Sequence, residues 1–210
     1  MLFLTRKYRP LLGLDITTSS VKLIELVMSG GSYRVESYAA EPTPQNAMNE
    51  KAIVDAEAVG EAIRRAVKRS GAGAKEVAIA ISGDAAITKV IQMPRHLRAN
   101  DLEGQVEMQA DQYIPFPMDE VSYDFEVLGP SEKDPETNDV LLVATRTENV
   151  EQRQAAVNAA GLTAKIVDVE AFALENEYGR LRSLTSMPDG SVLLTTDNGS
   201  GDKILRVRAS

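Results

Sequence analysis

The chain has 210 residues, a length that suits one domain or two small ones. Its composition, 43% apolar and 26% charged, is typical of a globular protein and excludes a disordered chain. The net charge of −8 argues against general nucleic-acid binding. The absence of cysteine excludes disulfides, zinc–thiolate sites and cysteine nucleophiles.

Residues 1–10 form a short leader in which apolar residues precede the basic ones. A secretory signal peptide has the opposite order, and no stretch of the chain approaches the length of a membrane span. The sequence therefore predicts a cytoplasmic protein. We interpret the leader as a solvated tail rather than a segment that touches a membrane surface.

The run from Leu11 to Lys22 predicts a buried strand, a turn rich in hydroxyl groups and the start of a second strand that continues to Met28. Backbone N–H groups, small hydroxyl side chains and a lysine suit a phosphate, and an aspartate can hold a metal-bound water. The alternative is an ordinary β-hairpin with a polar turn. The candidate phosphate-binding residues are Asp15, Thr17, Thr18, Ser19, Ser20 and Lys22.

The next part of the chain continues this pattern with one strand, one helix and two strands. Asp55 is the expected N-cap of the helix, and the Ser-Gly-Ala-Gly segment after it ends the helix. Three antiparallel strands followed by a helix and a strand are the order of a ribonuclease-H-like core. The expected elements are strand 32–38, helix 55–69 and strands 77–81 and 85–92.

A second series of elements predicts a small α+β insert. Asn100 and Glu103 form a capping-box pattern at the start of its first helix, and Gly161 is the expected C′ residue of its second. The expected elements are a helix from 100 to about 113, strands 121–128 and 140–145, helix 147–160, strand 164–169 and helix 170–178.

The run Tyr113, Ile114, Pro115 and Phe116 lies where the first helix of this insert ends. Apolar residues outside a helix favour a peptide-docking surface. The alternative, which the fixed geometry of the two prolines favours, is that Tyr113 and Phe116 fill the junction between helix and sheet.

Residues 179–210 differ from the rest in being rich in basic residues and turn signals. Segments 191–196 and 203–207 are predicted to form the strands of a hairpin.

Taken together, residues 11–178 resemble the amino-terminal part of the PilM family of type IV pilus assembly proteins, which is related to the cell-division protein FtsA. The YIPFP run followed by an acidic pair is the most distinctive part of the match. The four matching stretches are GLDITTSSVKLIEL (13–26), VAIAISGDAAITKVIQMP (77–94), ADQYIPFPMDEVSYDFEVLGP (110–130) and AAGLTAKIVDVEAFALEN (159–176).

The resemblance implies an α/β fold with an actin-like, ribonuclease-H-like first subdomain and an FtsA-type inserted subdomain. We expect the leader to end at residue 10, the actin-like subdomain to span 11–93, the insert to span 94–178 and a tail outside the family to span 179–210. Thr17 departs from the actin-type phosphate loop, which usually has glycine there, so we expect a differently shaped loop.

In function, the resemblance implies a protein at the inner face of the bacterial inner membrane, associated with the membrane only through its partners. The family binds the cytoplasmic amino-terminal peptide of the inner-membrane protein PilN in a groove between the two subdomains, and connects the pilus alignment complex to the cytoplasmic assembly ATPase machinery. The four residues Tyr113, Ile114, Pro115 and Phe116 are the candidate partner-binding set.

ATP and magnesium are the cofactors that the resemblance implies, with Asp15 at the metal. The resemblance to the family is expected to stop after Tyr178, before a second phosphate loop, and the tail is similar to a β-propeller blade of quinone-dependent sugar dehydrogenases. We therefore expect weak ATP binding and a non-catalytic assembly protein. The alternative is an ATP-hydrolysing actin-like protein of the FtsA type.

Overall fold

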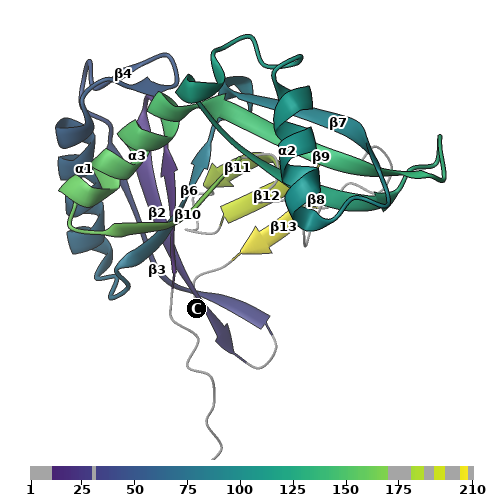
Figure 1. Cartoon of the computed structure of the whole chain (residues 1–210). Helices are drawn as coiled ribbons and strands as arrows, with labels where there is room; N and C mark the ends of the chain where they lie inside the picture. The colour runs from purple at the N-terminus through teal and green to yellow at the C-terminus, as the bar shows by residue number, and fades with distance from the viewer. Residues whose placement is uncertain (1–10, 30–31, 170–180, 187–191, 197–203, 208–210) are drawn as a thin grey trace, which may run out of the picture. The chain divides into compact units, whose positions relative to one another are not determined.

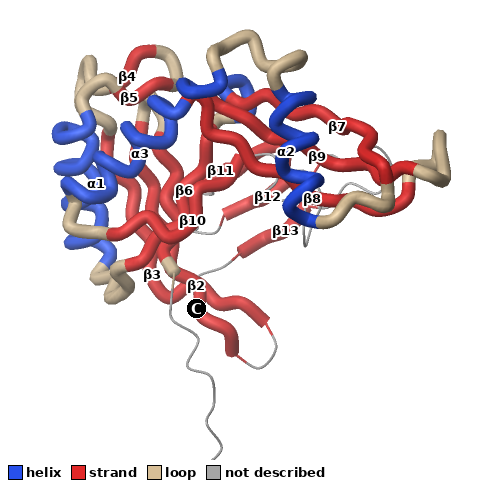
Figure 2. Tube along the Cα trace, viewed as in Figure 1, coloured by secondary structure: helices blue, strands red, loops and turns tan. Residues whose placement is uncertain are grey.

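A computed structural model describes residues 11–29, 32–169, 181–186, 192–196 and 204–207 of the chain. The chain divides into a first unit, Met1–Ile81 with Gln152–Ser210, and a second unit, Ser82–Glu151. Figures 1 and 2 show the helices and strands of both.

The first unit is built on a five-stranded sheet with the strand order β10-β6-β1-β2-β3. Strand β2 is antiparallel to both β1 and β3, whereas β6 runs parallel to both β1 and β10. This is the order of a ribonuclease-H-like core, so the predicted fold class is confirmed. The strands are β1 (Leu12–Ile16), β2 (Ser20–Ser29), β3 (Ser32–Pro42), β6 (Glu76–Ile81) and β10 (Thr163–Val169).

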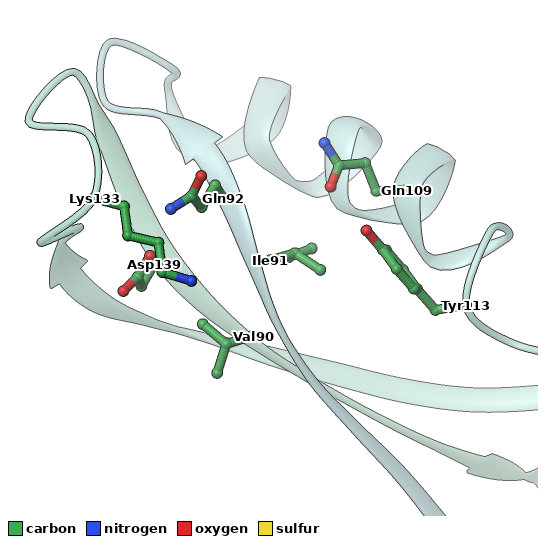
Figure 3. A pocket seen from close by; sticks show the side chains of 7 residues that line it. All are labelled: Val90, Ile91, Gln92, Gln109, Tyr113, Lys133 and Asp139. Atoms are coloured by element: carbon green, nitrogen blue, oxygen red, sulfur yellow. The ribbon is translucent and has the colours of Figure 1, made fainter.

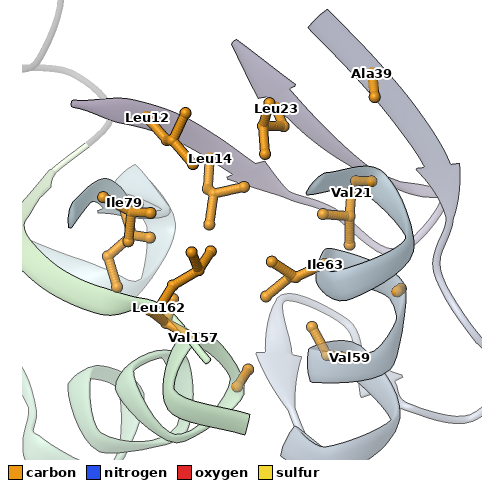
Figure 4. Close-up of a cluster of buried hydrophobic side chains, with 14 of the residues drawn as sticks. Leu12, Leu14, Val21, Leu23, Ala39, Val59, Ile63, Ile79, Val157 and Leu162 are labelled. Atoms are coloured by element: carbon orange, nitrogen blue, oxygen red, sulfur yellow. The ribbon is translucent and has the colours of Figure 1, made fainter. Parts of the chain in front are cut away.

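Two helices, α1 (Ala56–Ser70) and α3 (Thr147–Ala159), supply the other side of the first unit's core. Alternate residues of the strands are buried, as expected for a sheet with one covered face. In Figure 4, Leu14 and Ile79 of the sheet point into the same interior as Ile63 of α1 and Val157 of α3.

Helix α1 has the ends that its sequence predicts. The Asp55 side chain accepts a hydrogen bond from the Ala58 N–H at 2.9 Å, and Gly71 takes the left-handed conformation with φ 71°. A short two-stranded sheet, β4 (Met48–Asn49) with β5 (Ala52–Ile53), precedes the helix.

Arg153 of α3 is buried inside the first unit, with 2% of its surface exposed. Its Nε donates to the Ala80 carbonyl and its Nη2 donates to the Lys51 carbonyl, each at 3.1 Å. The guanidinium thereby joins α3 to the end of β6 and to the turn before β5, because it reaches two carbonyls at once.

The second unit is a three-stranded antiparallel sheet with the order β7-β9-β8. One face of the sheet packs against α2 (Ala99–Ala110), and Ile91, Met93, Val106 and Leu142 are among the buried residues between them. The remaining elements are η1 (Gly83–Ala85), β7 (Ala86–Pro94), η2 (Met118–Glu120), β8 (Val121–Pro130) and β9 (Thr137–Arg146).

The bounds of the two units differ from those that we predicted. Strand β7 pairs with β9 rather than with the first sheet, and β10 pairs with β6 of the first sheet. The inserted unit therefore runs from 82 to 151 instead of from 94 to 178. The local pattern of a strand does not reveal its pairing partner, which explains both errors.

Helix α2 begins one residue before Asn100, and the preceding residue, Arg98, is its N-cap without a side-chain cap bond. The predicted capping box at Asn100 and Glu103 is therefore wrong.

Towards the carboxyl end, β11 (Leu181–Ser186), β12 (Val192–Thr196) and β13 (Ile204–Val207) form a three-stranded antiparallel sheet. The predicted pairing of the last two strands is confirmed, and β11 adds a third. The leader and the predicted helix 170–178 lie outside the described residues. No described helix is both long and apolar enough to cross a membrane.

Candidate functional site

The turn between β1 and β2 places an acid and a base opposite each other. Asp15 and Lys22 are paired in the strand register, and the Lys22 Nζ lies 3.0 Å from the Asp15 Oδ2. Both side chains are partly exposed, Lys22 to 33% and Asp15 to 47%, so the ion pair is accessible to a ligand.

Thr17 gives this turn its shape. Its Oγ1 accepts a hydrogen bond from the Ser20 N–H at 3.1 Å and donates to the Ser20 carbonyl at 2.9 Å. The Thr43 hydroxyl donates to the Thr17 carbonyl at 2.7 Å, and the Thr43 N–H donates to the Ser19 carbonyl at 3.2 Å. Thr17 does not have a positive φ, so the conformation that would require glycine is not used here.

The exposed hydroxyls of this turn belong to Thr18 and Ser19, since Thr17 and Ser20 are partly buried within it. With the Lys22 ammonium they form a set of hydrogen-bond donors and positive charge of the kind that suits a phosphate group. All six predicted residues thus lie at one hairpin of the first unit, with Asp15 and Lys22 on its strands and the hydroxyl residues at its turn.

The carboxylate that this turn offers to a metal ion is that of Asp15. Among the described residues there is no group of three or more His, Asp or Glu side chains placed to hold a metal ion. A single carboxylate fits magnesium that keeps several waters and is held chiefly by phosphates. It does not fit a metal that the side chains alone would bind.

The corner between α2 and β8 holds the predicted partner-binding residues. Ile114 is 5% exposed and belongs to the core of the second unit, whereas Tyr113 and Phe116 are 44% and 36% exposed. Pro115 is exposed as well. The interpretation that Tyr113 and Phe116 fill the junction of helix and sheet is therefore wrong, because Ile114 fills it.

Phe116 is held by a residue that sequence reasoning missed. The Arg146 guanidinium lies 5.3 Å from the centre of the Phe116 ring, and its Nη2 donates to Glu120 Oε2 at 3.3 Å. Arg146 ends β9, far from Phe116 in sequence, so no spacing rule connects the two. The contact favours one position of this exposed aromatic ring, by about 0.5–1 kcal/mol.

The chain matches a known protein family over most of its length. The sequence model of the family described as "Type IV pilus assembly protein PilM" matches residues 13–200. The match extends beyond Tyr178, where we expected the resemblance to stop, and so includes most of the segment predicted to lie outside the family.

Two solved structures are similar to the chain. A PilM–PilN type IV pilus biogenesis complex matches with 28% identity and a TM-score of 0.69, covering 94% of this chain and 61% of that chain. The cytoplasmic domain of EpsL, an inner-membrane component of the type II secretion system of Vibrio cholerae, matches with 17% identity and a TM-score of 0.53. It covers 93% of this chain and 71% of that chain, and at this identity it shows the fold alone.

Proposed function

Because the chain belongs to the family of type IV pilus assembly protein PilM, we propose that it acts in pilus assembly by binding the cytoplasmic amino-terminal peptide of a PilN-type inner-membrane protein. The support is the likeness to a PilM–PilN complex, of whose matched chain this one spans 61%. In this proposal the protein lies at the inner face of the inner membrane, where its PilN-type partner holds it. It connects that partner to the cytoplasmic assembly ATPase machinery.

The corner around Phe116 is the surface that we assign to this peptide. Aromatic residues and arginine dominate binding energy at protein interfaces, and Tyr113, Phe116 and Arg146 are of these types. Phe116 is exposed and already held by Arg146, so little side-chain entropy is lost when a partner covers it. This preorganised exposed ring is the observation that carries the proposal.

Titration calorimetry of the whole chain with a synthetic PilN-type amino-terminal peptide tests the assignment. Phe116→Ala is expected to weaken binding by about tenfold or more, as for an interface hot spot. Met108→Ala is the matched control, because Met108 is apolar and exposed on α2 of the same unit. Absence of binding by the folded chain, or an equal loss in both variants, would reject the assignment.

We further propose that the β1–β2 turn binds the phosphates of ATP. Lys22, Thr18 and Ser19 would hold the phosphate oxygens, and Asp15 would accept hydrogen bonds from waters on magnesium. Magnesium, when bound, neutralises part of the phosphate charge. The geometry that supports this proposal is the 3.0 Å pair of Lys22 and Asp15 beside the exposed hydroxyls.

A further inference from the structure

Strand β7 is an open edge of the second unit's sheet. In the part of the chain that the structure describes, its one strand neighbour is β9. The pairing runs from Ala86 opposite Thr145 to Pro94 opposite Thr137 without a shift of register. A regular edge of nine residues is a template on which another strand can pair.

The direction of the backbone groups on β7 follows from one hydrogen bond. The Arg95 N–H donates to the Glu136 carbonyl at 3.0 Å, which makes Pro94 and Thr137 a pair without direct hydrogen bonds. Since the pattern alternates, the N–H and C=O groups of Thr88, Val90 and Gln92 point away from β9. These outward groups need hydrogen-bond partners, from water or from an added strand.

A pocket of about 430 Å³ surrounds the middle of this edge. In Figure 3, Gln109 and Tyr113 of the α2 end lie on one side of β7, and Lys133 and Asp139 lie on the other. The pocket thus has walls on both faces of the edge strand, as a site for alternating side chains of an added strand requires. Its lining residues are Val90, Ile91, Gln92, Gln109, Tyr113, Lys133 and Asp139.

The opposite edge of the same sheet, β8, is less suited to such pairing. Its register against β9 shifts between Val127 and Gly129, and Gly129 has φ 125°. Exposed acidic side chains, such as Glu126, follow the strand. A bulge and charges are two devices that keep an edge from pairing.

Charge indicates what the β7 edge binds. Residues 82–151 contain 15 acidic and 5 basic side chains, a net charge of −10, so the rest of the chain carries +2. Two such units would repel each other, whereas a basic segment would be attracted. Lys89 and Pro94 on β7 restrict pairing with any strand, from a second copy or from a partner, so the stretch left for strand addition is Val90 to Gln92.

We propose that the β7 edge binds an extended, basic segment of a partner protein by β-strand addition, with the outward groups of Val90 and Gln92 as its main-chain hydrogen-bond partners. Side chains of the added strand alternate between the Tyr113 side and the Asp139 side of the pocket. The surface uses main-chain groups of β7 and is distinct from the corner around Phe116, with which it shares Tyr113.

The probe that tests this is a fluorescein-labelled nonapeptide of alternating valine and lysine, titrated into the whole chain by fluorescence anisotropy. We expect saturable binding that weakens about tenfold or more when the four central amides of the peptide are N-methylated, because methylation removes the donors that strand addition needs. This comparison leaves the protein unchanged and does not depend on the folding of any variant.

Variants at Val90 provide the matched test on the protein. Val90→Pro removes an outward N–H without removing a bond to β9, and is expected to weaken binding about tenfold. Val90→Thr keeps the N–H and should bind as the wild type does. Thermal unfolding followed by circular dichroism verifies that both variants are folded.

Several outcomes would overturn the proposal. These are no binding by the wild type, equal binding of the methylated and unmodified peptides, or equally tight binding of a valine–glutamate nonapeptide. Displacement of the nonapeptide by a PilN-type peptide would show one shared site and reject a separate surface. If the PilN-type peptide fails to bind while the nonapeptide binds, only the function proposed above is lost.

Discussion

Gly60 of α1 lies so close to Ala159 of α3 that a Cβ on Gly60 would stand 2.6 Å from the Cβ of Ala159. The same atom would stand 2.9 Å from the Ala156 carbonyl oxygen. Real Cβ atoms do not approach other atoms so closely. The two helices can therefore pack at this distance only because Gly60 has no side chain.

Gly60→Ala should therefore destabilise the first unit by about 1–3 kcal/mol, the usual cost of overpacking, although alanine favours helix. Gly104→Ala is the control, because Gly104 lies in α2 with no atom within 4 Å of the added Cβ. It should raise the free energy of unfolding by up to about 1 kcal/mol. Urea unfolding measures both, and a stabilising Gly60→Ala would contradict the close approach.

Arg153→Met should lower stability by about 2 kcal/mol or more, because it removes the two hydrogen bonds that the buried guanidinium donates to the Ala80 and Lys51 carbonyls. Arg153→Lys keeps the charge but cannot reach both carbonyls, so an intermediate loss is expected. Lys68→Met on the exposed side of α1 is the control, with a change within about 0.5 kcal/mol. Equal stability of the Arg153→Met and Lys68→Met variants would show that the two buried bonds contribute little.

Lys22→Met should weaken the binding of a fluorescent ATP analogue by about tenfold or more, since an ammonium that meets a phosphate contributes a charge-assisted hydrogen bond. Lys75→Met removes the same charge at an exposed position before β6 and should leave the affinity unchanged. The proposed phosphate site would be rejected by analogue binding that both variants retain in full.

The ionisation of Tyr123 is expected to affect the free energy of unfolding at alkaline pH. Burial raises the pKa of Tyr123 above its ordinary value, and the nearby Glu107 and Glu103 carboxylates raise it further. The folded state thus holds this proton more tightly than the unfolded chain. Its contribution to stability is complete below about pH 10 and is lost as the pH rises through the folded-state pKa.

In Tyr123→Phe, the free energy of unfolding should therefore fall less steeply above about pH 10 than in the wild type. Denaturant unfolding at a series of pH values provides the comparison, and identical slopes for the two proteins would contradict the prediction.

The features that the sequence predicted correctly are those determined by a few adjacent residues, such as the ends of helices. Asp55 starts α1, and Gly71 and Gly161 take positive φ angles after the helices that they follow. A cap or a left-handed glycine is determined by a few adjacent residues, so its signal lies in one short segment. Asn100 shows the limit, because the same short pattern also fits inside a helix.

Pairing and side-chain contacts between distant segments could not be predicted. Strand β7 has the pattern of a half-buried strand whether it pairs with β9 or with the first sheet. The choice of Ile114 over Phe116 as the buried residue, and the contact of Phe116 with Arg146, depend on how the chain returns after α2 and β9. These relationships are set by tertiary packing, for which a single sequence provides no spacing rule.

The second unit begins and ends at one place. Ala86 at the start of β7 pairs with Thr145 near the end of β9, and the Thr145 hydroxyl donates to the Ala85 carbonyl at 2.7 Å. The two ends of this unit's sheet thus lie side by side. An insert of this kind can be exchanged between homologues as one piece, because both of its ends are at the same end of the β7–β9 pair. Its acidic surface and open edge can therefore vary independently of the ribonuclease-H-like core that carries it.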